Sequence, residues 1–183
     1  MKRKITLQLF RVTLLFATLT MNSTVIAQTS LKDKKIIADA KKSKTEFIKT
    51  DGLMKNIFDK AYGYVIFPNV GKGGVVIGGA AGNGAVYQSG ALIGMAKLTQ
   101  VTIGFQWGGQ AYREVIFFET KKDLDNFKED NLEFAAQASA VAATAGASAN
   151  ANYKNGVMIF TQTKGGLMYE ASVGGQKFKF RNL

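Results

Sequence analysis

The fold of this chain is decided by residues 61–118, which read AYGYVIFPNVGKGGVVIGGAAGNGAVYQSGALIGMAKLTQVTIGFQWGGQAYREVIFF. Of the chain's 20 glycines, 13 lie between Gly63 and Gly109, among β-branched and aromatic residues that favour strands. A glycine inside a strand weakens it unless a sharp bend or another backbone must come close. The stretch therefore predicts a tightly bent β-sheet.

Turn residues divide this stretch and the C-terminal part into expected strands. The first strand is expected at Tyr64–Pro68, because proline ends a central strand. Asn83-Gly84 is typical of a tight hairpin turn and predicts a hairpin between residues 74–81 and 85–88. Further strands are expected at 91–97, 99–107, 111–118, 156–163 and 167–173, and 176–180 is a candidate edge strand.

Two helical segments are expected before the sheet. The first carries apolar residues on one side at helical spacing, namely Ile36, Ile37, Ala40, Phe47 and Ile48. Asp51-Gly52 breaks it, and a second, shorter apolar face follows, made by Leu53, Met54, Ile57, Phe58 and Ala61. A surface helix is expected over residues 120–130, with Thr120 as N-cap and Asp123 three residues on.

Residues 131–152 are ambiguous, because their alanine content favours a helix. Small residues at every second position, and no helical stripe of large apolar groups, favour an extended and closely packed strand instead. The expected fold is α+β, with N-terminal helices packed on a strongly curved, mostly antiparallel β-sheet. Whether this sheet closes into a barrel is left open by the sequence.

The first 27 residues have the features of a secretory signal peptide. They combine a basic start (Lys2, Arg3, Lys4 and Arg11), a short apolar core at 12–21, and small residues that suit cleavage before Gln28. The apolar run is shorter than the roughly 18–20 residues of a spanning helix, which favours cleavage over an uncleaved anchor. We expect an exported protein, periplasmic or peripheral on the envelope membrane, with one domain over residues 28–183.

The composition narrows the chemistry. The chain has no cysteine, so its fold must rest on a hydrophobic core without disulfides. It has no histidine, the commonest residue of catalytic triads, zinc sites and pH switches, and we expect neither metal nor cofactor. Four of the 24 basic residues lie in the leader. The others, set against 13 acidic residues, give the chain after the leader a net charge of +7. This charge points to an acidic partner, and the exported location argues against nucleic acid.

Two glycine-rich motifs lack the context of nucleotide loops. Residues 71–74, GKGG, do not have phosphate-loop spacing, and no helix pattern follows them. A turn between two strands is the better interpretation, with Lys72 at its tip, where it could meet a phosphate headgroup. Residues 79–84 precede a hairpin pattern, where a dinucleotide fingerprint requires a helix.

Candidates for catalysis are few. The acids of the sheet half are Glu114, Glu119 and Glu170, with Arg113 nearby. Paired carboxylates could in principle hydrolyse a glycoside. Glu114 and Arg113 are neighbours on a strand and so point to opposite faces, and nothing brackets a substrate cleft. We interpret these acids as surface charges at strand ends and expect no enzyme.

The lysine-rich segment before the sheet is the main functional candidate. Lys34, Lys35, Lys41 and Lys42 lie mostly off the apolar side of the expected helix, whereas Lys44 falls within it. Lysines beside an apolar face suit an anionic membrane surface, where each contributes roughly 1 kcal/mol. An ordinary helix that packs its apolar side on the sheet explains the same pattern, and both interpretations can hold together.

Several motifs together resemble the SYLF domain family, which is described as lipid-binding and, in yeast, actin-binding. The resemblance rests on GYVIFPNVGKGG at 63–74, residues 78–84, GGQAYREVIFF at 108–118 and residues 131–146, and covers roughly residues 36–175. It implies phospholipid binding by the basic N-terminal part, with Lys72 matching the motif itself. Lys34, Lys35, Lys41, Lys42 and Lys44 match only by segment and character. The ending KGGLMYEASVGGQKF at 164–178 departs from the family's usual ending.

The expected function is non-enzymatic binding of anionic phospholipid headgroups at a membrane surface. The expected lipid-binding residues are Lys34, Lys35, Lys41, Lys42, Lys44 and Lys72. An exported bacterial protein does not meet actin or, ordinarily, phosphoinositides, so actin binding is not expected and the lipid must be another anionic one. The alternative is an envelope scaffold that binds a protein or glycan without membrane contact. A hydrolase that uses Glu114 or Glu170 has little support in the sequence.

Overall fold

The computed structural model describes residues 31–183 except 75–76, 104–109, 131, 134–138 and 165–170. The chain divides between residues 35 and 36, and residues 36–183 form one compact unit. The expected signal peptide, residues 1–27, lies outside the described residues. None of the helices in the described ranges is long and apolar enough to cross a bilayer.

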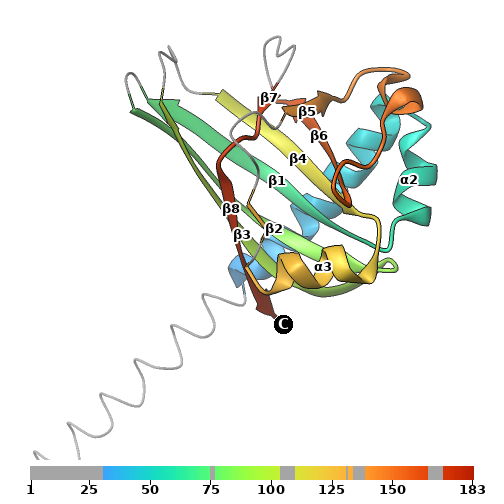
Figure 1. Cartoon of the computed structure of the whole chain (residues 1–183), viewed down its shortest axis with the longest axis horizontal. Helices are drawn as coiled ribbons and strands as arrows, with labels where there is room; N and C mark the ends of the chain where they lie inside the picture. The colour runs from blue at the N-terminus through green and yellow to red at the C-terminus, as the bar shows by residue number, and fades with distance from the viewer. Residues whose placement is uncertain (1–30, 75–76, 104–109, 131, 134–138, 165–170) are drawn as a thin grey trace, which may run out of the picture. The chain divides into compact units, whose positions relative to one another are not determined.

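The described strands form a mostly antiparallel sheet, and the α+β class is confirmed (Figure 1). Their bounds are β1 Gly63–Gly74, β2 Ile77–Gln88, β3 Ala91–Ile103, β4 Gln110–Phe118, β5 Ser139–Ala142, β6 Val157–Thr163, β7 Ala171–Ser172 and β8 Gln176–Asn182. The eight strands have the order β7-β5-β6-β4-β1-β2-β3-β8, and only β5 and β6 pair in parallel. The helical parts are residues 31–50, α2 (Met54–Lys60), α3 (Lys121–Lys128) and the 3-10 helix η1 (Ala147–Asn150).

The sheet curls strongly over one of its own faces. In the strand order β8 stands four places from β4, which would be about 19 Å in a flat sheet. The Gln176 amide of β8 nevertheless donates a hydrogen bond to Glu114 Oε2 of β4 across 3.0 Å. The expected curvature is therefore confirmed. The edge strands β7 and β8 do not pair with each other within the described residues, so the sheet there is curled but open.

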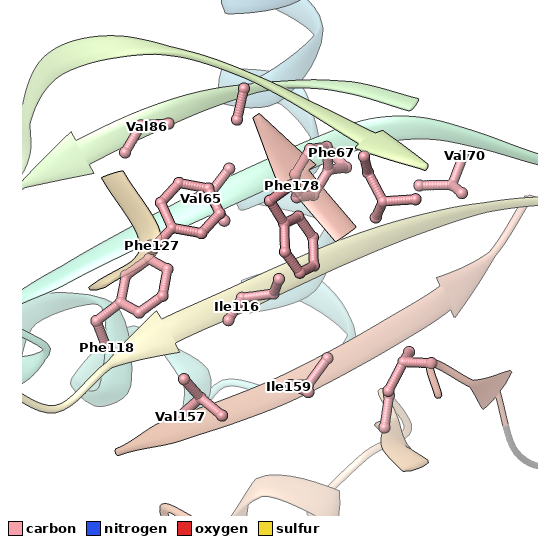
Figure 2. Close-up of a cluster of buried hydrophobic side chains, with 14 of the residues drawn as sticks. Val65, Phe67, Val70, Val86, Ile116, Phe118, Phe127, Val157, Ile159 and Phe178 are labelled. Carbon is pink, nitrogen blue, oxygen red and sulfur yellow. The ribbon is translucent and has the colours of Figure 1, made fainter. Parts of the chain in front are cut away.

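Each side of the sheet has its own hydrophobic core. On the inner side, the sheet is covered by α3 and by β8, which the curl brings over β4. Phe127 of α3 lies against both Phe118 and Phe178 (Figure 2). On the outer side, the first helix and α2 pack on another set of strand residues. This outer core contains Phe47 and Phe58 from the helices. Both the curl and the helical cover thus come from apolar burial.

Strand β1 does not end at Pro68, as expected, but continues to Gly74. Its register against both β2 and β4 shifts around this proline, where β1 carries one residue more than its partners. Such a bulge interrupts the hydrogen-bond ladder, so the missing proline amide leaves no strand bond unmade. The prediction that Pro68 ends the strand is therefore wrong.

The expected hairpin at Asn83-Gly84 is also wrong, because β2 runs through both residues. A Cβ atom on Gly84 would lie 2.7 Å from a ring carbon of Phe67, so glycine is needed here for close approach of an aromatic ring. That is the role first expected for glycines in this stretch. Residues 91–103 likewise form one strand, β3, where two were expected.

The remaining predictions are confirmed in part. Thr120 and Asp123 form a capping box at the start of α3, and Leu124 and Phe127 are buried as expected of its inner side. Among the described residues of 131–152, a strand is formed by 139–142; Gly146 has a φ of 76°, and the 3-10 helix η1 follows it. The edge strand β8 is confirmed.

Candidate functional site

The apolar side of the first helix is occupied by the protein itself. Ala40 and Phe47 are fully buried in the outer core, and Ile36, Ile37 and Ile48 pack partly buried against it. The interpretation as a helix that packs on the sheet is therefore confirmed for residues 36–50. Its apolar side chains are not free to enter a membrane while the helix is docked.

The expected lipid-binding lysines of the compact unit have different surroundings. Lys41 and Lys42 are neighbours and exposed on the helix. Lys34 and Lys35 are also exposed in helical residues, in the part of the chain before the compact unit. Lys44 and Lys72 are partly buried, so the four lysines of the compact unit do not share one exposed surface.

Lys44 is partly buried and lies against two aromatic side chains of the outer core, Phe58 and Tyr64. Its Nζ donates a hydrogen bond to the Tyr64 hydroxyl at 3.2 Å and lies 4.7 Å from the centre of the Phe58 ring. Burial lowers the pKa of Lys44, and the negative charge of Asp59 partly offsets this effect. The side chain thus contributes a cation–π contact to the docking of α2.

Lys72 lies within β1 and not at the tip of a turn, which corrects the sequence interpretation. It is paired with Ala80 of β2 and Gln110 of β4, two residues after the buried Val70. Alternation along a strand places Lys72 on the inner side with Val70, while Gly71 and Gly73 are exposed on the other side. Burial lowers the pKa of Lys72, since desolvation disfavours the ammonium ion.

A polar cluster inside the curled sheet was not predicted. Glu114 and Gln176 are 0% exposed, and the buried Tyr112, Gln100 and Thr161 lie on the same inner side of β4, β3 and β6. The interpretation of Glu114 as a surface charge is therefore wrong. Alternation with Ile116 and Phe118 on β4 was a usable signal, because it assigns Glu114 to the face of these apolar residues. Glu119 is exposed, and Glu170 lies outside the described residues.

Burial governs the electrostatics of this cluster. It raises the pKa of Glu114 to about 7, and the hydrogen bond from Gln176 only partly offsets the effect. It also raises the pKa of the Tyr112 hydroxyl, to which the neighbouring Glu114 adds. In the described part of the chain, Glu114 Oε1 and Gln176 Oε1 have no hydrogen-bond partner. No group of three or more potential metal ligands occurs among the described residues.

The outer side of the sheet has two halves. The covered sheet face lies under the helices and is buried; it consists of Tyr64, Ile66, Ala85, Tyr87, Met95, Val115, Phe117, Met158 and Phe160. The open sheet face is exposed; it consists of Asn69, Gly71, Gly73, Ala81, Asn83, Lys97, Thr99, Val101, Lys177 and Lys179. The open sheet face thus carries three lysines and no carboxylate among these ten residues.

Comparisons with known proteins agree with the sequence motifs. A family model described as Ysc84, Las17-binding protein actin regulator, matches residues 99–182, which include β4 to β8. The chain is also similar to beta cell expansion factor A of Aeromonas veronii, with 30% identity over 125 residues. The aligned part covers 68% of this chain and 48% of that relative, so the chain spans about half the length of the curated relative. With the motifs in the glycine-rich strands, these matches show that the chain belongs to the SYLF family.

Proposed function

We propose that this protein binds anionic phospholipid at a membrane surface, as a peripheral and non-enzymatic component of the cell envelope. The SYLF family is a binding-domain family associated with lipid binding. The observation that carries the proposal is that cations are exposed while the apolar side of the first helix is docked on the sheet. The open sheet face has three lysines and no carboxylate among its ten residues, and Lys41 and Lys42 are exposed on the helix. The groups that the protein can present to a membrane are therefore cationic more than apolar.

This arrangement favours electrostatic attraction over deep insertion. Since Ile36 and Phe47 are packed in the protein, shallow insertion would have to come from exposed apolar side chains such as Leu53, which is 48% exposed. Attraction between exposed charges and headgroups is screened within about 8 Å at physiological ionic strength. Binding should therefore weaken markedly as salt is added.

Vesicle co-sedimentation tests the proposal. Purified mature protein is mixed with vesicles of phosphatidylcholine alone or with added phosphatidylglycerol, at low and high salt. We expect recovery with the anionic vesicles only, and release at high salt. Equal recovery with both vesicle types, insensitive to salt, would contradict the proposal.

We also propose that residues 1–27 direct export and are removed. The proposal rests on their basic start, short apolar core and small residues before Gln28. Mass spectrometry of protein from the envelope fraction should find Gln28 as the first residue. A protein that starts at Met1 and stays with the cytoplasmic fraction would contradict it.

A second candidate function is protein binding without membrane contact. The description of the matching family names binding to a protein, Las17, which supports a protein partner for family members. This candidate predicts that neutralising Lys34, Lys35, Lys41 and Lys42 leaves partner recovery unchanged in a pull-down from envelope extracts. A loss of the partner together with vesicle binding would favour the lipid function.

A further inference from the structure

The open sheet face holds two lysines directly opposite each other. Lys97 of β3 and Lys179 of β8 are register partners on the same side, and both are exposed. Directly opposite like charges destabilise a strand pair. The third lysine of the face, Lys177, has the Glu133 carboxylate at 3.4 Å. The Lys97–Lys179 pair has no such counter-charge among the ten residues of the face.

Further basic groups lie on β4 and directly after the end of β6. Arg113 of β4 donates a hydrogen bond to the Gln162 side chain at 2.8 Å, and Lys164 donates one to the Asn69 side chain. These cations are spread across several strands and do not converge on one point. Such spacing suits a surface of many anionic groups better than one small anion.

Between the cations the open sheet face is made of small side chains. Gly71, Ala81 and Thr99 lie side by side on β1, β2 and β3. The open sheet face has one larger apolar side chain, Val101, two residues beyond Thr99 on β3. It is 73% exposed. Small side chains let a flat partner approach closely, and a single exposed valine beside lysines suits the boundary between headgroups and acyl chains.

We propose that the open sheet face is the surface that lies against the anionic bilayer. Lys97 and Lys179 contact the lipid phosphates, and Val101 enters the interface. This inference rests on the proposed lipid binding and assigns it to the sheet, where the sequence pointed to the first helix. The sheet holds its two lysines on paired strands, so their spacing is set before binding.

Matched charge variants separate this inference from the proposed function. Three doubles each remove two charges: Lys97→Gln with Lys179→Gln, Lys41→Gln with Lys42→Gln, and Lys121→Gln with Lys122→Gln on α3. Partition onto vesicles with phosphatidylglycerol should fall about fivefold per lysine for the first double, and less than about twofold for the others.

The outcomes are distinct. Unchanged binding of the sheet double, with a loss for the Lys41/Lys42 double, would overturn the inference and leave the proposed function standing. A wild-type protein that ignores anionic vesicles would overturn both. Equal losses for all three doubles would show that only total charge matters, which also overturns the inference.

A single-site probe reports contact directly. Because the chain has no cysteine, Val101→Cys carries the only thiol and can be labelled with a polarity-sensitive dye. Its matched control is Ala38→Cys, an exposed position on the first helix. Anionic vesicles should shift the emission of the dye at 101 to the blue and leave the dye at 38 unchanged. A shift at 38 alone, or a shift at 101 that grows with protein concentration without vesicles, would overturn the inference; the second result would assign the face to another copy of this chain.

Discussion

Strand β3 contributes Met95 to the covered sheet face and Lys97, Thr99 and Val101 to the open one. The same backbone ladder thus passes from a buried half to an exposed half within a few residues. The type of side chain on the sheet changes with the helical cover. Aromatic residues such as Tyr87 and Phe117 fill the buried half, and glycine, alanine and lysine occupy the exposed half.

The covered half is the part of the outer side on which the first helix and α2 pack. On β6, the Gln162 amide donates a hydrogen bond to the Thr50 hydroxyl at 2.6 Å, at the last residue of the helix. The chain then turns at Asp51 into α2. The helical cover therefore decides which part of the outer side is core and which part remains exposed.

The largest expected effect concerns the covered sheet face. Phe117 is 0% exposed and lies within 4.8 Å of the Phe58 ring, centre to centre. Phe117→Ala should lower the free energy of unfolding by about 3–5 kcal/mol, because it removes buried contacts and leaves a cavity. Urea denaturation gives the loss as a lower midpoint.

Thr99→Ala on the open sheet face is the matched control. An exposed substitution of this kind should stay within about 0.5 kcal/mol of the wild type. Similar losses for the two variants would show that the open half is covered in solution, and the comparison between the halves would fail.

The next effect concerns the inner side of the sheet, where Glu114 is buried. Its chain neighbours Arg113 and Val115 lie on the outer side. The pKa of Glu114 is raised from 4.5 to about 7 by burial, so the folded state holds this proton more tightly than the unfolded chain. Stability should therefore fall as pH rises from about 4.5 to about 7, by about 3 kcal/mol in all. Below that window the group is protonated in both states and costs nothing.

Glu114→Gln tests this directly. The variant keeps an acceptor for the Gln176 amide but has no charge to bury. It should match the wild type near pH 4.5 and be more stable by about 3 kcal/mol at pH 8. Denaturation curves at several pH values measure this difference. An equal pH dependence in variant and wild type would show that Glu114 does not titrate in this window.

A smaller loss of stability is expected at Asp51, which is hydrogen-bonded to Ser148 of η1. Asp51 is buried and accepts hydrogen bonds from the Ser148 amide at 2.8 Å and the Leu53 amide at 3.1 Å. Burial alone would raise the pKa of Asp51, but these hydrogen bonds outweigh it and lower the pKa below 3.8. Asp51→Ala should cost about 1–3 kcal/mol at pH 7.

The sign of this shift sets the pH dependence. A lowered folded-state pKa gives stability that is present above the unfolded value and lost as pH falls through the folded one. The gap between Asp51→Ala and the wild type should therefore narrow in acid. Asp59→Ala, at an exposed carboxylate paired with Lys55, is the control and should change little. A gap that widens in acid would contradict the assignment.

The smallest effect has the opposite sign. Lys97→Glu on the open sheet face replaces a like-charge pair with Lys179 by an opposite-charge pair. It should raise stability by at most about 1 kcal/mol and weaken binding to anionic vesicles. Thermal unfolding and co-sedimentation on the same sample give both values. A variant that loses stability, or that binds as well as the wild type, would remove the argument that these lysines are kept for a partner.

Local patterns explain most of what could be predicted. The capping box at Thr120 and Asp123 needs only four consecutive residues, and the helical stripe around Ala40 and Phe47 needs only spacing. The errors at Pro68 and Asn83-Gly84 have one cause. Both motifs usually end or turn a strand. Here each strand is paired on both sides, so β1 continues through a bulge at Pro68 and β2 continues past Gly84, where an aromatic ring lies close.

The candidate site was less predictable, because it depends on contacts between distant residues. Lys44 was expected among the lipid-binding lysines, and only the packing of α2 against Tyr64 shows its aromatic surroundings. The exposed face of Lys97 and Lys179 was not singled out at all. Nothing near either lysine in the sequence shows that β3 and β8 pair, or that the helices leave both lysines uncovered.

The sequence by itself determined the family resemblance, the α+β class, the helical segments and the approximate positions of most strands, because contiguous motifs and short-range periodicity carry them. The tertiary structure alone decided which charges are buried and which are exposed. Glu114 meets Gln176, 62 residues away, only because the sheet curls until β8 lies over β4. Burial comes from that curl and from which part of the outer side the helices cover, and neither can be read from neighbouring residues.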